Sequence, residues 1–223
     1  MLVDTLPKPS PRRVVLASNN AKKLEELAAL LAPAGIELVT QGSLGVTEAE
    51  EPHGTFLENA LAKARHAAAA TGLPAIADDS GLCVDALGGQ PGVMSAVYAE
   101  LETTLLVGLP REDLRAMQDT ANNERLLAAM QGRADRGARF VCTLVALRSA
   151  DDPEPLVAFG RWQGELLNAQ RGSGGFGYDP LLSIPSLGCT VAELDAPTKN
   201  RLSHRALAAE QMLGLLRSAW SLG

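Results

Sequence analysis

The segment FVCTLVAL, residues 140–147, is apolar at nearly every position, and it constrains the fold more than any other part of the chain. Successive side chains of a strand point to opposite faces of a sheet, so a strand with this sequence must be buried on both faces. Residues 156–162 follow across the turn-prone SADDPEP and predict the partner strand of an antiparallel hairpin. The two segments therefore indicate a hairpin inside a buried sheet.

The N-terminal half alternates between strand and helix patterns. Residues 13–18 (RVVLAS) form a β-branched apolar run, and two asparagines then precede a leucine-rich helical pattern over residues 24–31. Gly35 is expected to end this helix, and residues 36–39 are expected to form a second strand. Strand and helix in alternation, together with the hairpin, predict one α/β unit with a mixed sheet.

A capping box gives the clearest helix signal. Thr55 and Glu58 have its spacing, and an alanine-rich helix is predicted from there to Gly72. Residues 75–77 then predict a short strand that runs into the turn-prone residues 78–81 (DDSG). An acidic pair is thus expected at the end of a strand.

The remaining segments set the domain organisation. Prolines alternate near the start, so residues 1–12 are expected to be a disordered leader. Residues 122–130 and 198–220 have helical patterns, and the second predicts one amphipathic closing helix. With no internal repeat and no linker, residues 13–223 are expected to form a single domain.

Charge and cysteine usage exclude several classes of protein. The chain has 26 acidic and 20 basic residues, and a net charge of −6 disfavours binding to a nucleic acid polymer or to an anionic membrane. Cys83, Cys142 and Cys189 are far apart and odd in number, which argues against a zinc cluster or a disulfide framework and fits the reducing cytoplasm. No segment reaches the ~18 apolar residues of a membrane span.

Two lysines in the first turn of the first predicted helix suggest an anion site. Lys22 and Lys23 lie where the helix dipole is already positive, and a bound phosphate would relieve that arrangement. The alternative is a tolerated surface pair. In the alanine-rich helix, Asn59 and Lys63 share one face, which taken alone is most simply a solvated face, and Glu51 belongs to an acidic loop.

Asp78 and Asp79 are the strongest candidates for chemistry. Adjacent residues of a strand point to opposite faces, so we expect Asp79 to face a cleft and Asp78 to hold the turn. Carboxylates without a histidine or cysteine cluster suit a hard cation such as Mg²⁺. The alternative is an ordinary Asx-type turn.

A glycine-rich stretch, RGSGGFGYDP, contains a formal G-x-G-x-x-G at Gly172, Gly174 and Gly177. No strand precedes it directly and a proline follows it, so a dinucleotide-binding turn is rejected. The loop still offers Phe176 or Tyr178 for stacking on a flat ligand. Further on, Ser203, His204 and Arg205 lie near Lys199 and bring cationic groups together.

Taken in order, SNNAKKLEEL, FLENALAKARHAA, AIADDSGLCVDALGGQPGV, GGFGYDPLL and AELDAPTKNRLSHRALA resemble the inosine triphosphate pyrophosphatase (HAM1-like) family. The resemblance covers the chain from Arg13 to its end. It implies an elongated mixed sheet flanked by helices, with two lobes around a central nucleotide cleft. It also implies a Mg²⁺-dependent homodimer that hydrolyses non-standard purine nucleoside triphosphates (ITP, dITP, XTP) to the monophosphate and pyrophosphate.

The resemblance also implies roles for particular residues. The triphosphate would be bound by Ser18, Asn19, Asn20, Ala21, Lys22 and Lys23. Asp79 would be the catalytic acceptor and, with Glu51, a metal ligand, while the cleft would be lined by Asn59, Lys63 and Ser80. The base would be enclosed by Phe176, Gly177, Tyr178, Asp179, Lys199, His204 and Arg205.

Two rival functions remain in view. One is a nucleotide-binding module without turnover, which the combination of Asp79 with Glu51 disfavours. The other is a pyrimidine nucleotide pyrophosphatase of the similarly folded Maf family, which the Ser203-His204-Arg205 signature disfavours. The chain departs from bacterial relatives at Val97, where they usually carry arginine, and over residues 99–118.

Overall fold

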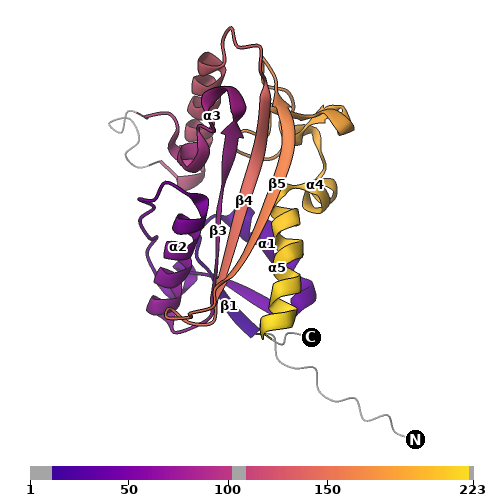
Figure 1. Ribbon diagram of the computed structural model, residues 1–223. Coiled ribbons are helices and arrows are strands. Elements are labelled where there is room, and N and C mark those ends of the chain that lie inside the picture. Colours follow the sequence, from indigo (N-terminus) through magenta and orange to yellow (C-terminus); the bar gives the residue numbers. More distant parts are fainter. Residues whose placement is uncertain (1–11, 102–108, 221–223) are drawn as a thin grey trace, which may run out of the picture.

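A computed structural model describes residues 12–101 and 109–220. Its centre is a seven-stranded sheet in the order β2-β1-β3-β4-β5-β6-β7 (Figure 1). The strands are β1 (Arg12–Leu16), β2 (Ile36–Thr40), β3 (Ala75–Val84), β4 (Gly137–Leu147), β5 (Leu156–Leu166), β6 (Leu182–Ile184) and β7 (Cys189–Thr190). The first three strands pair in parallel and all later pairs are antiparallel, so the mixed sheet and the β4–β5 hairpin are confirmed.

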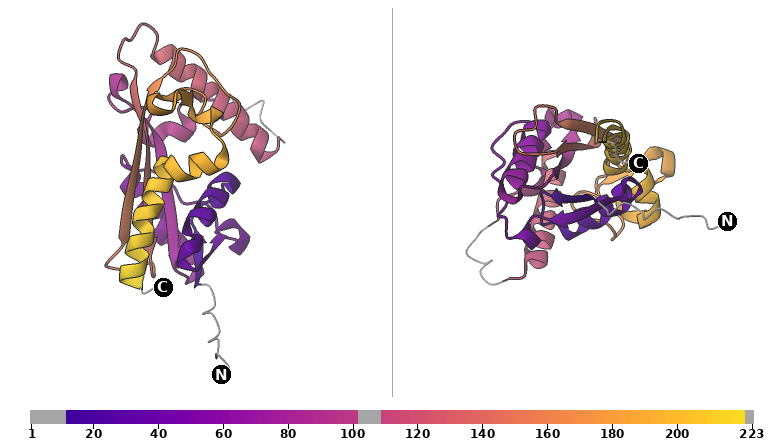
Figure 2. Two further views of the ribbon diagram at one scale, coloured as in Figure 1. Left: turned by 90° about the vertical axis from the view of Figure 1, so that its right-hand side faces the viewer. Right: turned by 90° about the horizontal axis from the view of Figure 1, so that it is seen from below.

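Helices cover both faces of this sheet, as Figures 1 and 2 show. They are α1 (Ala21–Leu31), α2 (Phe56–Thr71), α3 (Arg111–Ala129), α4 (Ala196–Leu202) and α5 (His204–Trp220), with the short 3₁₀ segment η4 (Gly92–Val97). One face packs against the alanines of α2, and the other packs against α1 and α5. No helix within the described residues is long and apolar enough to cross a membrane.

The face that carries α1 and α5 holds two separate apolar cores. Near one end of the long strands, Ile76 and Leu144 pack against α1 and α5. Near the other end, Leu82 and Phe140 pack against Leu126 of α3. Asp78 and Ser80 lie between these cores on β3, since they share the face of Ile76 and Leu82. The two cores correspond to the two expected lobes, and polar residues occupy the strip between them.

The capping signal for α2 is confirmed at both ends. The Thr55 hydroxyl accepts from the backbone N–H of Glu58 at 3.2 Å, and Gly72 ends the helix at φ +67°. The Glu58 carboxylate accepts from the Thr55 hydroxyl at 2.6 Å. The Thr55 and Glu58 side chains of the capping box therefore hydrogen-bond directly to each other.

The expected turn at residues 78–81 is wrong, because β3 runs without a break from Ala75 to Val84. Aspartate, serine and glycine have low strand propensity, so their pattern predicts a strand end. Tertiary contacts override that preference. Every residue from Ala75 to Val84 pairs with β4, and both aspartates form ion pairs with lysine or arginine.

The prediction of a single closing helix is also wrong, because two helices, α4 and α5, occupy this part of the chain. Ser203 adopts an extended conformation (φ −68°, ψ 161°) and separates α4 from α5, and its hydroxyl accepts from the N–H of Ala206 at 3.2 Å. Serine is a strong N-cap residue, so the chain restarts a helix here in a new direction.

Two other boundaries differ from the sequence expectations. Helix α3 begins at Arg111, well before the predicted residue 122. The leader predicted for residues 1–12 lies outside the described residues except for Arg12, which opens β1, and residues 102–108 of the segment 99–118 also lie outside them. The rejection of a dinucleotide turn is confirmed, because β5 ends at Leu166 and residues 172–177 form a loop.

Candidate functional site

Asp79 forms the centre of a cluster on the α2 face of the sheet. Its Oδ1 accepts from Lys63 Nζ at 2.8 Å, and the same ammonium lies 3.2 Å from Glu51 Oε2. Asp79 Oδ2 is buried and has no hydrogen-bond partner among the described residues. Burial, with the nearby Glu51 charge, raises the pKa of Asp79 to about 6 although Lys63 acts in the opposite direction.

Helix α2 holds the loop that carries Glu51. The Asn59 side chain accepts from the His53 N–H at 3.0 Å and donates to the His53 carbonyl at 3.2 Å. Two helical turns further along α2, His66 Nε2 lies 3.0 Å from the Thr47 carbonyl. Asn59 therefore contacts the loop backbone, and it positions Glu51 beside Lys63.

A second cluster occupies the opposite face of β3. Asp78 accepts from Lys23 Nζ at 2.6 Å and from Arg205 Nε at 2.8 Å. Arg205 also pairs with Glu26, which lies 3.2 Å from Lys199 Nζ. These contacts join residues of α1, β3, α4 and α5 into one chain of alternating charges.

Asp78 stays ionised in this environment. Burial alone would raise its pKa, but the charges of Lys23 and Arg205 outweigh burial and hold the pKa well below its usual value. Burial likewise opposes the charge of Arg205, yet Asp78 and Glu26 raise its pKa above the usual value. The ion pairs thus compensate for the loss of water around each charge.

The first turn of α1 has the expected cap. The Asn20 side chain accepts from the backbone N–H groups of Lys22 and Lys23 at 3.1 and 3.3 Å. Ser18 Oγ accepts from the Asn20 N–H, and Asn19 Oδ1 accepts from the Gly42 N–H. Ala21 and Lys22 are exposed at this helix end.

Phe176 lies beside three of the cationic side chains. The Lys199 ammonium is 4.5 Å from the ring centroid, the Lys22 ammonium is 5.7 Å away, and the Arg205 guanidinium is 5.8 Å away. Asp179 accepts from Lys199 at 2.9 Å and from the Phe176 N–H at 2.9 Å. The glycine loop and the N-terminus of α1 therefore meet around one aromatic ring.

His204 and Tyr178 are buried in different ways. The His204 ring stacks on Phe140 with centroids 4.9 Å apart, and burial and the Arg205 charge lower its pKa well below the usual value. His204 is therefore neutral at pH 7. Tyr178 belongs to the core beside α3, and its hydroxyl donates to the Ser95 carbonyl at 2.9 Å. Ser80 donates to Asp78 on the second cluster's side.

The two clusters meet at an edge of β3. Strand β1 pairs with β3 only at Ala75 and Ile76, so the β1-side edge beyond Ile76 is not covered by β1. Lys23 binds Asp78 on one face, and its positive charge also slightly opposes the rise in the pKa of Asp79 on the other face. A ligand lying along the edge can therefore contact both faces.

Some predicted residues converge here and others serve the scaffold. Lys23, Lys63, Glu51, Asp79, Ser80, Phe176, Asp179, Lys199 and Arg205 lie in the two clusters or around Phe176. Sequence reasoning missed Glu26, although it lies one helical turn after Lys22 and Lys23, where ion-pair partners are expected. It also missed Cys142, whose thiol donates to Asp78 at 3.3 Å and which no local pattern marks.

The residues around Asp79 fit a hard divalent cation. No group of three or more histidine, cysteine, aspartate or glutamate side chains suited to a metal occurs in the described ranges. Mg²⁺ needs fewer, since it commonly binds one or two carboxylates and completes its shell with water and substrate phosphates. The unpartnered Asp79 Oδ2 and the nearby Glu51 supply that donor set.

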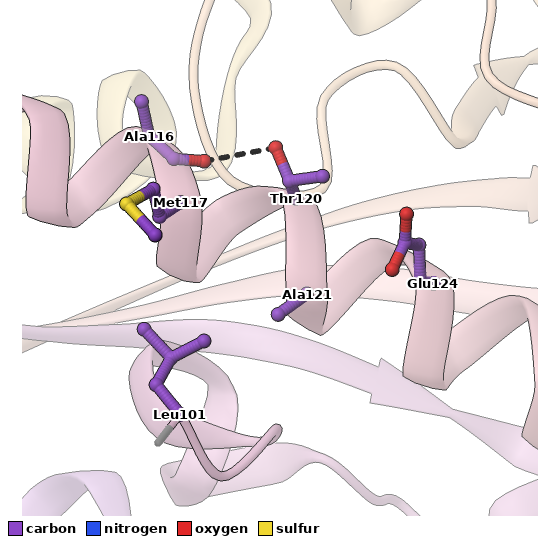
Figure 3. A pocket seen from close by; sticks show the side chains of 6 residues that line it. All are labelled: Leu101, Ala116, Met117, Thr120, Ala121 and Glu124. Atoms are coloured by element: carbon purple, nitrogen blue, oxygen red, sulfur yellow. Dashed lines mark hydrogen bonds between the residues drawn. The ribbon is translucent and has the colours of Figure 1, made fainter. Parts of the chain in front are cut away.

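A pocket of about 390 Å³ lies elsewhere, between α3 and the segment that carries Leu101 (Figure 3). Its lining consists of Leu101, Ala116, Met117, Thr120, Ala121 and Glu124. None of these residues was predicted as a site residue. The pocket is mostly apolar and holds no cluster of charges of the kind found around β3.

Comparisons with known proteins agree with this geometry. A profile of the Ham1 family matches residues 14–215. The chain is 78% identical over 210 residues to the dITP/XTP pyrophosphatase of Leptothrix cholodnii, covering 94% of this chain and 99% of that protein. It is 68% identical to the enzyme of the same name from Methylibium petroleiphilum, covering 93% and 99%.

Solved structures give the same result. A HAM1 protein from Coxiella burnetii superposes with a TM-score of 0.81 at 41% identity, over 93% of this chain and all of that one. The Staphylococcus aureus Ham1 protein gives 0.77 at 33% identity, over 93% and 99%. The family resemblance noted in the sequence and the predicted fold class are thus confirmed. The chain belongs to the Ham1 family.

Proposed function

We propose that this protein hydrolyses non-standard purine nucleoside triphosphates (dITP, ITP and XTP) to the monophosphate and pyrophosphate. The observation that carries the proposal is the pairing of two clusters across one edge of β3. On one face Asp79 keeps an unpartnered carboxylate oxygen beside Glu51 and Lys63. On the other face cationic side chains surround an aromatic ring. The relatives named dITP/XTP pyrophosphatase support the same reaction.

Asp79 and Glu51 hold the metal ion, which is Mg²⁺ in this proposal. A bound Mg²⁺ supplies charge neutralisation on the phosphates and lowers the pKa of a coordinated water. Asp79 orients the attacking water and accepts its proton, as expected of a carboxylate whose pKa is raised toward neutrality. Lys63 keeps the two carboxylates together and offers positive charge to the α-phosphate.

The triphosphate lies along the first turn of α1. Lys23 lies in this turn with its ammonium held by Asp78, and the exposed Ala21 and Lys22 mark the helix N-terminus where anions bind favourably. Ser18, Asn19 and Asn20 shape this turn through their hydrogen bonds. Cleavage between the α- and β-phosphates then releases pyrophosphate from the lysine side of the site.

The base lies against Phe176, within reach of Lys199, His204 and Arg205. An aromatic face stacks on any purine, so stacking adds affinity without selectivity. Selectivity comes from the polar groups around the ring. Buried N–H groups such as those of Arg205 and Lys199 can donate to a 6-oxo group, whereas a 6-amino group would place donor against donor.

We also propose a cytoplasmic homodimer. The family resemblance implies the dimer, and the three cysteines, all free of disulfides, suit a reducing compartment. Light scattering tests the dimer directly. The mass in solution should be near twice that of the 23.4 kDa chain, and a mass equal to one chain would reject it.

A substrate panel tests the proposed reaction. Turnover of dITP, ITP, XTP, dATP, dGTP and dUTP is measured with and without Mg²⁺, and products are separated by chromatography. We expect Mg²⁺-dependent release of dIMP and pyrophosphate from dITP in equal amounts, with dATP far slower. Release of orthophosphate and a diphosphate nucleoside, or a preference for dUTP, would contradict the proposal.

A further inference from the structure

Two side chains of helix α3 hydrogen-bond to the backbone of the glycine loop at Gly177. The Asp119 carboxylate accepts from the Gly177 N–H at 2.8 Å, and Asn123 Nδ2 donates to the Gly177 carbonyl at 2.9 Å. Asp119 and Asn123 are four residues apart in a helix, so both side chains leave the same face of α3. We call these two residues the Gly177 clamp.

The clamp specifies one orientation of the loop backbone. Gly177 has φ +62°, a conformation that residues with a side chain rarely adopt. Asn123 is buried, and its Oδ1 has no hydrogen-bond partner among the described residues. Turning this amide over would place Oδ1 against the Gly177 carbonyl, so only the observed orientation forms a bond.

The clamped N–H belongs to the peptide group that joins Phe176 to Gly177. On the other side of that peptide the Phe176 ring lies near Lys22, Lys199 and Arg205. The preceding residues 172–175 are exposed and include three glycines, and they are held at two points: the Gly174 N–H donates to the Ala192 carbonyl, and the Gly175 carbonyl accepts from Lys22 Nζ at 3.2 Å. Besides the clamp, the Phe176 backbone makes two bonds to Asp179: its N–H donates to the carboxylate at 2.9 Å, and its carbonyl accepts from the Asp179 N–H at 3.3 Å.

We propose that Asp119 and Asn123 are positioning residues that set the Phe176 ring against the nucleobase. The inference rests on the proposed function, in which Phe176 stacks on the base. Helix α3 contributes no residue to either charge cluster. Through these two residues it would nevertheless control nucleotide affinity. Without the clamp the ring has more conformations, and binding must then select one of them.

The test measures binding of inosine monophosphate and of pyrophosphate, each with Mg²⁺, by calorimetry. Asp119→Ala should weaken inosine monophosphate binding about tenfold, the effect of losing one charge-assisted hydrogen bond. Pyrophosphate affinity should stay within about twofold, because Lys23 is held by Asp78 and does not depend on the loop, whereas Lys22 contacts this loop at Gly175 and beside the Phe176 ring. Asp119→Asn keeps an acceptor oxygen and should recover most of the affinity. Asp113→Ala, an exposed carboxylate of α3, is the matched control and should change neither ligand.

A double variant separates positioning from general stability. If Asp119 acts through the ring, Asp119→Ala should cause no further loss in a Phe176→Ala background. Equal weakening of both ligands, or a full tenfold loss in the Phe176→Ala background, would overturn the inference. Wild-type protein that fails to bind inosine monophosphate would instead reject the proposed function. Wild-type-like binding by Asp119→Ala, with Phe176→Ala impaired, would reject the clamp alone.

Discussion

Asp78 and Asp79 are neighbours in the chain, yet their pKa values move in opposite directions. Both carboxylates are buried, and burial alone would raise the pKa of each. Two cations, Lys23 and Arg205, reverse that effect at Asp78, whereas Lys63 only partly offsets it at Asp79, where Glu51 adds a like charge. Asp78 is therefore a permanent anion that holds cations, while Asp79 can take up and release a proton near neutral pH.

Asp78→Asn should mainly destabilise the fold. The change leaves Arg205 and Lys23 with a neutral partner, and breaking a buried ion pair costs about 3 kcal/mol of unfolding free energy. Since the pKa of Asp78 is lowered, its stabilising effect is complete at neutral pH and is lost only in strong acid. Urea unfolding at pH 7 measures the loss. A variant as stable as wild type would show that the ion pairs contribute little.

The pH at which kcat/KM falls on the acidic side should depend on the Mg²⁺ concentration. Below a pH of about 6 the Asp79 carboxyl is protonated and cannot act as a base or bind metal. Metal binds the ionised form, so saturating Mg²⁺ should move the limb of kcat/KM to lower pH than subsaturating Mg²⁺. Profiles at two Mg²⁺ concentrations measure this shift. If the midpoint pH of the acidic limb does not change with Mg²⁺ concentration, a group other than Asp79 causes the loss of activity in acid.

The sequence could predict residues whose role follows from local pattern, and it could not predict partners from distant elements. Local pattern marked Lys23 and Asp79 as candidates, and alternation correctly placed Asp78 and Asp79 on opposite faces. The solvated face that local pattern indicated for Asn59 and Lys63 is wrong, because both side chains are buried. Nothing local indicated that Asp78 would meet Arg205, since 127 positions separate them. The expected turn role of Asp78 failed for that reason.

The contact between α5 and β5 sets the position of His204 and Arg205. Gly160 of β5 lies directly under the start of α5, and a Cβ there would overlap the backbone carbonyl of His204 and approach the Ala208 nitrogen at 2.8 Å. Both neighbours are backbone atoms and cannot rotate away. The absence of a side chain at Gly160 therefore lets His204 and Arg205 approach β3.

Gly160→Ala should move the start of α5 away from the sheet. We expect a loss of about 2 kcal/mol of unfolding free energy from overpacking, and a raised KM for dITP as Arg205 shifts. Gly214→Ala, in the same helix with open space around its Cβ, is the matched control and should stabilise by roughly 0.5–1 kcal/mol. Denaturation and steady-state kinetics measure both. If Gly160→Ala and Gly214→Ala had the same unfolding free energy and the same KM for dITP, the close contact at Gly160 would be contradicted.

Elements with strong local signals were predicted well, and boundaries set by tertiary contacts were not. The apolar pattern of β4 and the caps of α2 decide those elements locally, so both were found. The length of β3 depends on pairing with β4, and the break at Ser203 depends on packing of α4 and α5 at different angles. Local sequence carries neither constraint, which is why both were missed.

At the scale of the whole molecule, β3, β4 and β5 run through both lobes. The apolar cores at the two ends share these strands, so neither lobe can lose its sheet without the other. We propose that residues 13–223 unfold as one unit. Calorimetry should give a single transition whose calorimetric and van't Hoff enthalpies agree. Two separated transitions would indicate independently folding lobes.

Asp78 and Asp79 lie on β3 between the ends that carry the two apolar cores, and we propose that Asp79 performs the chemistry. The most direct measurement is Mg²⁺-dependent turnover of dITP by Asp79→Asn, with folding verified by circular dichroism. The change preserves side-chain volume and removes the charge that orients water and metal, so kcat should fall by about a hundredfold or more. Turnover within a few-fold of wild type, with dIMP and pyrophosphate still the products, would contradict the account.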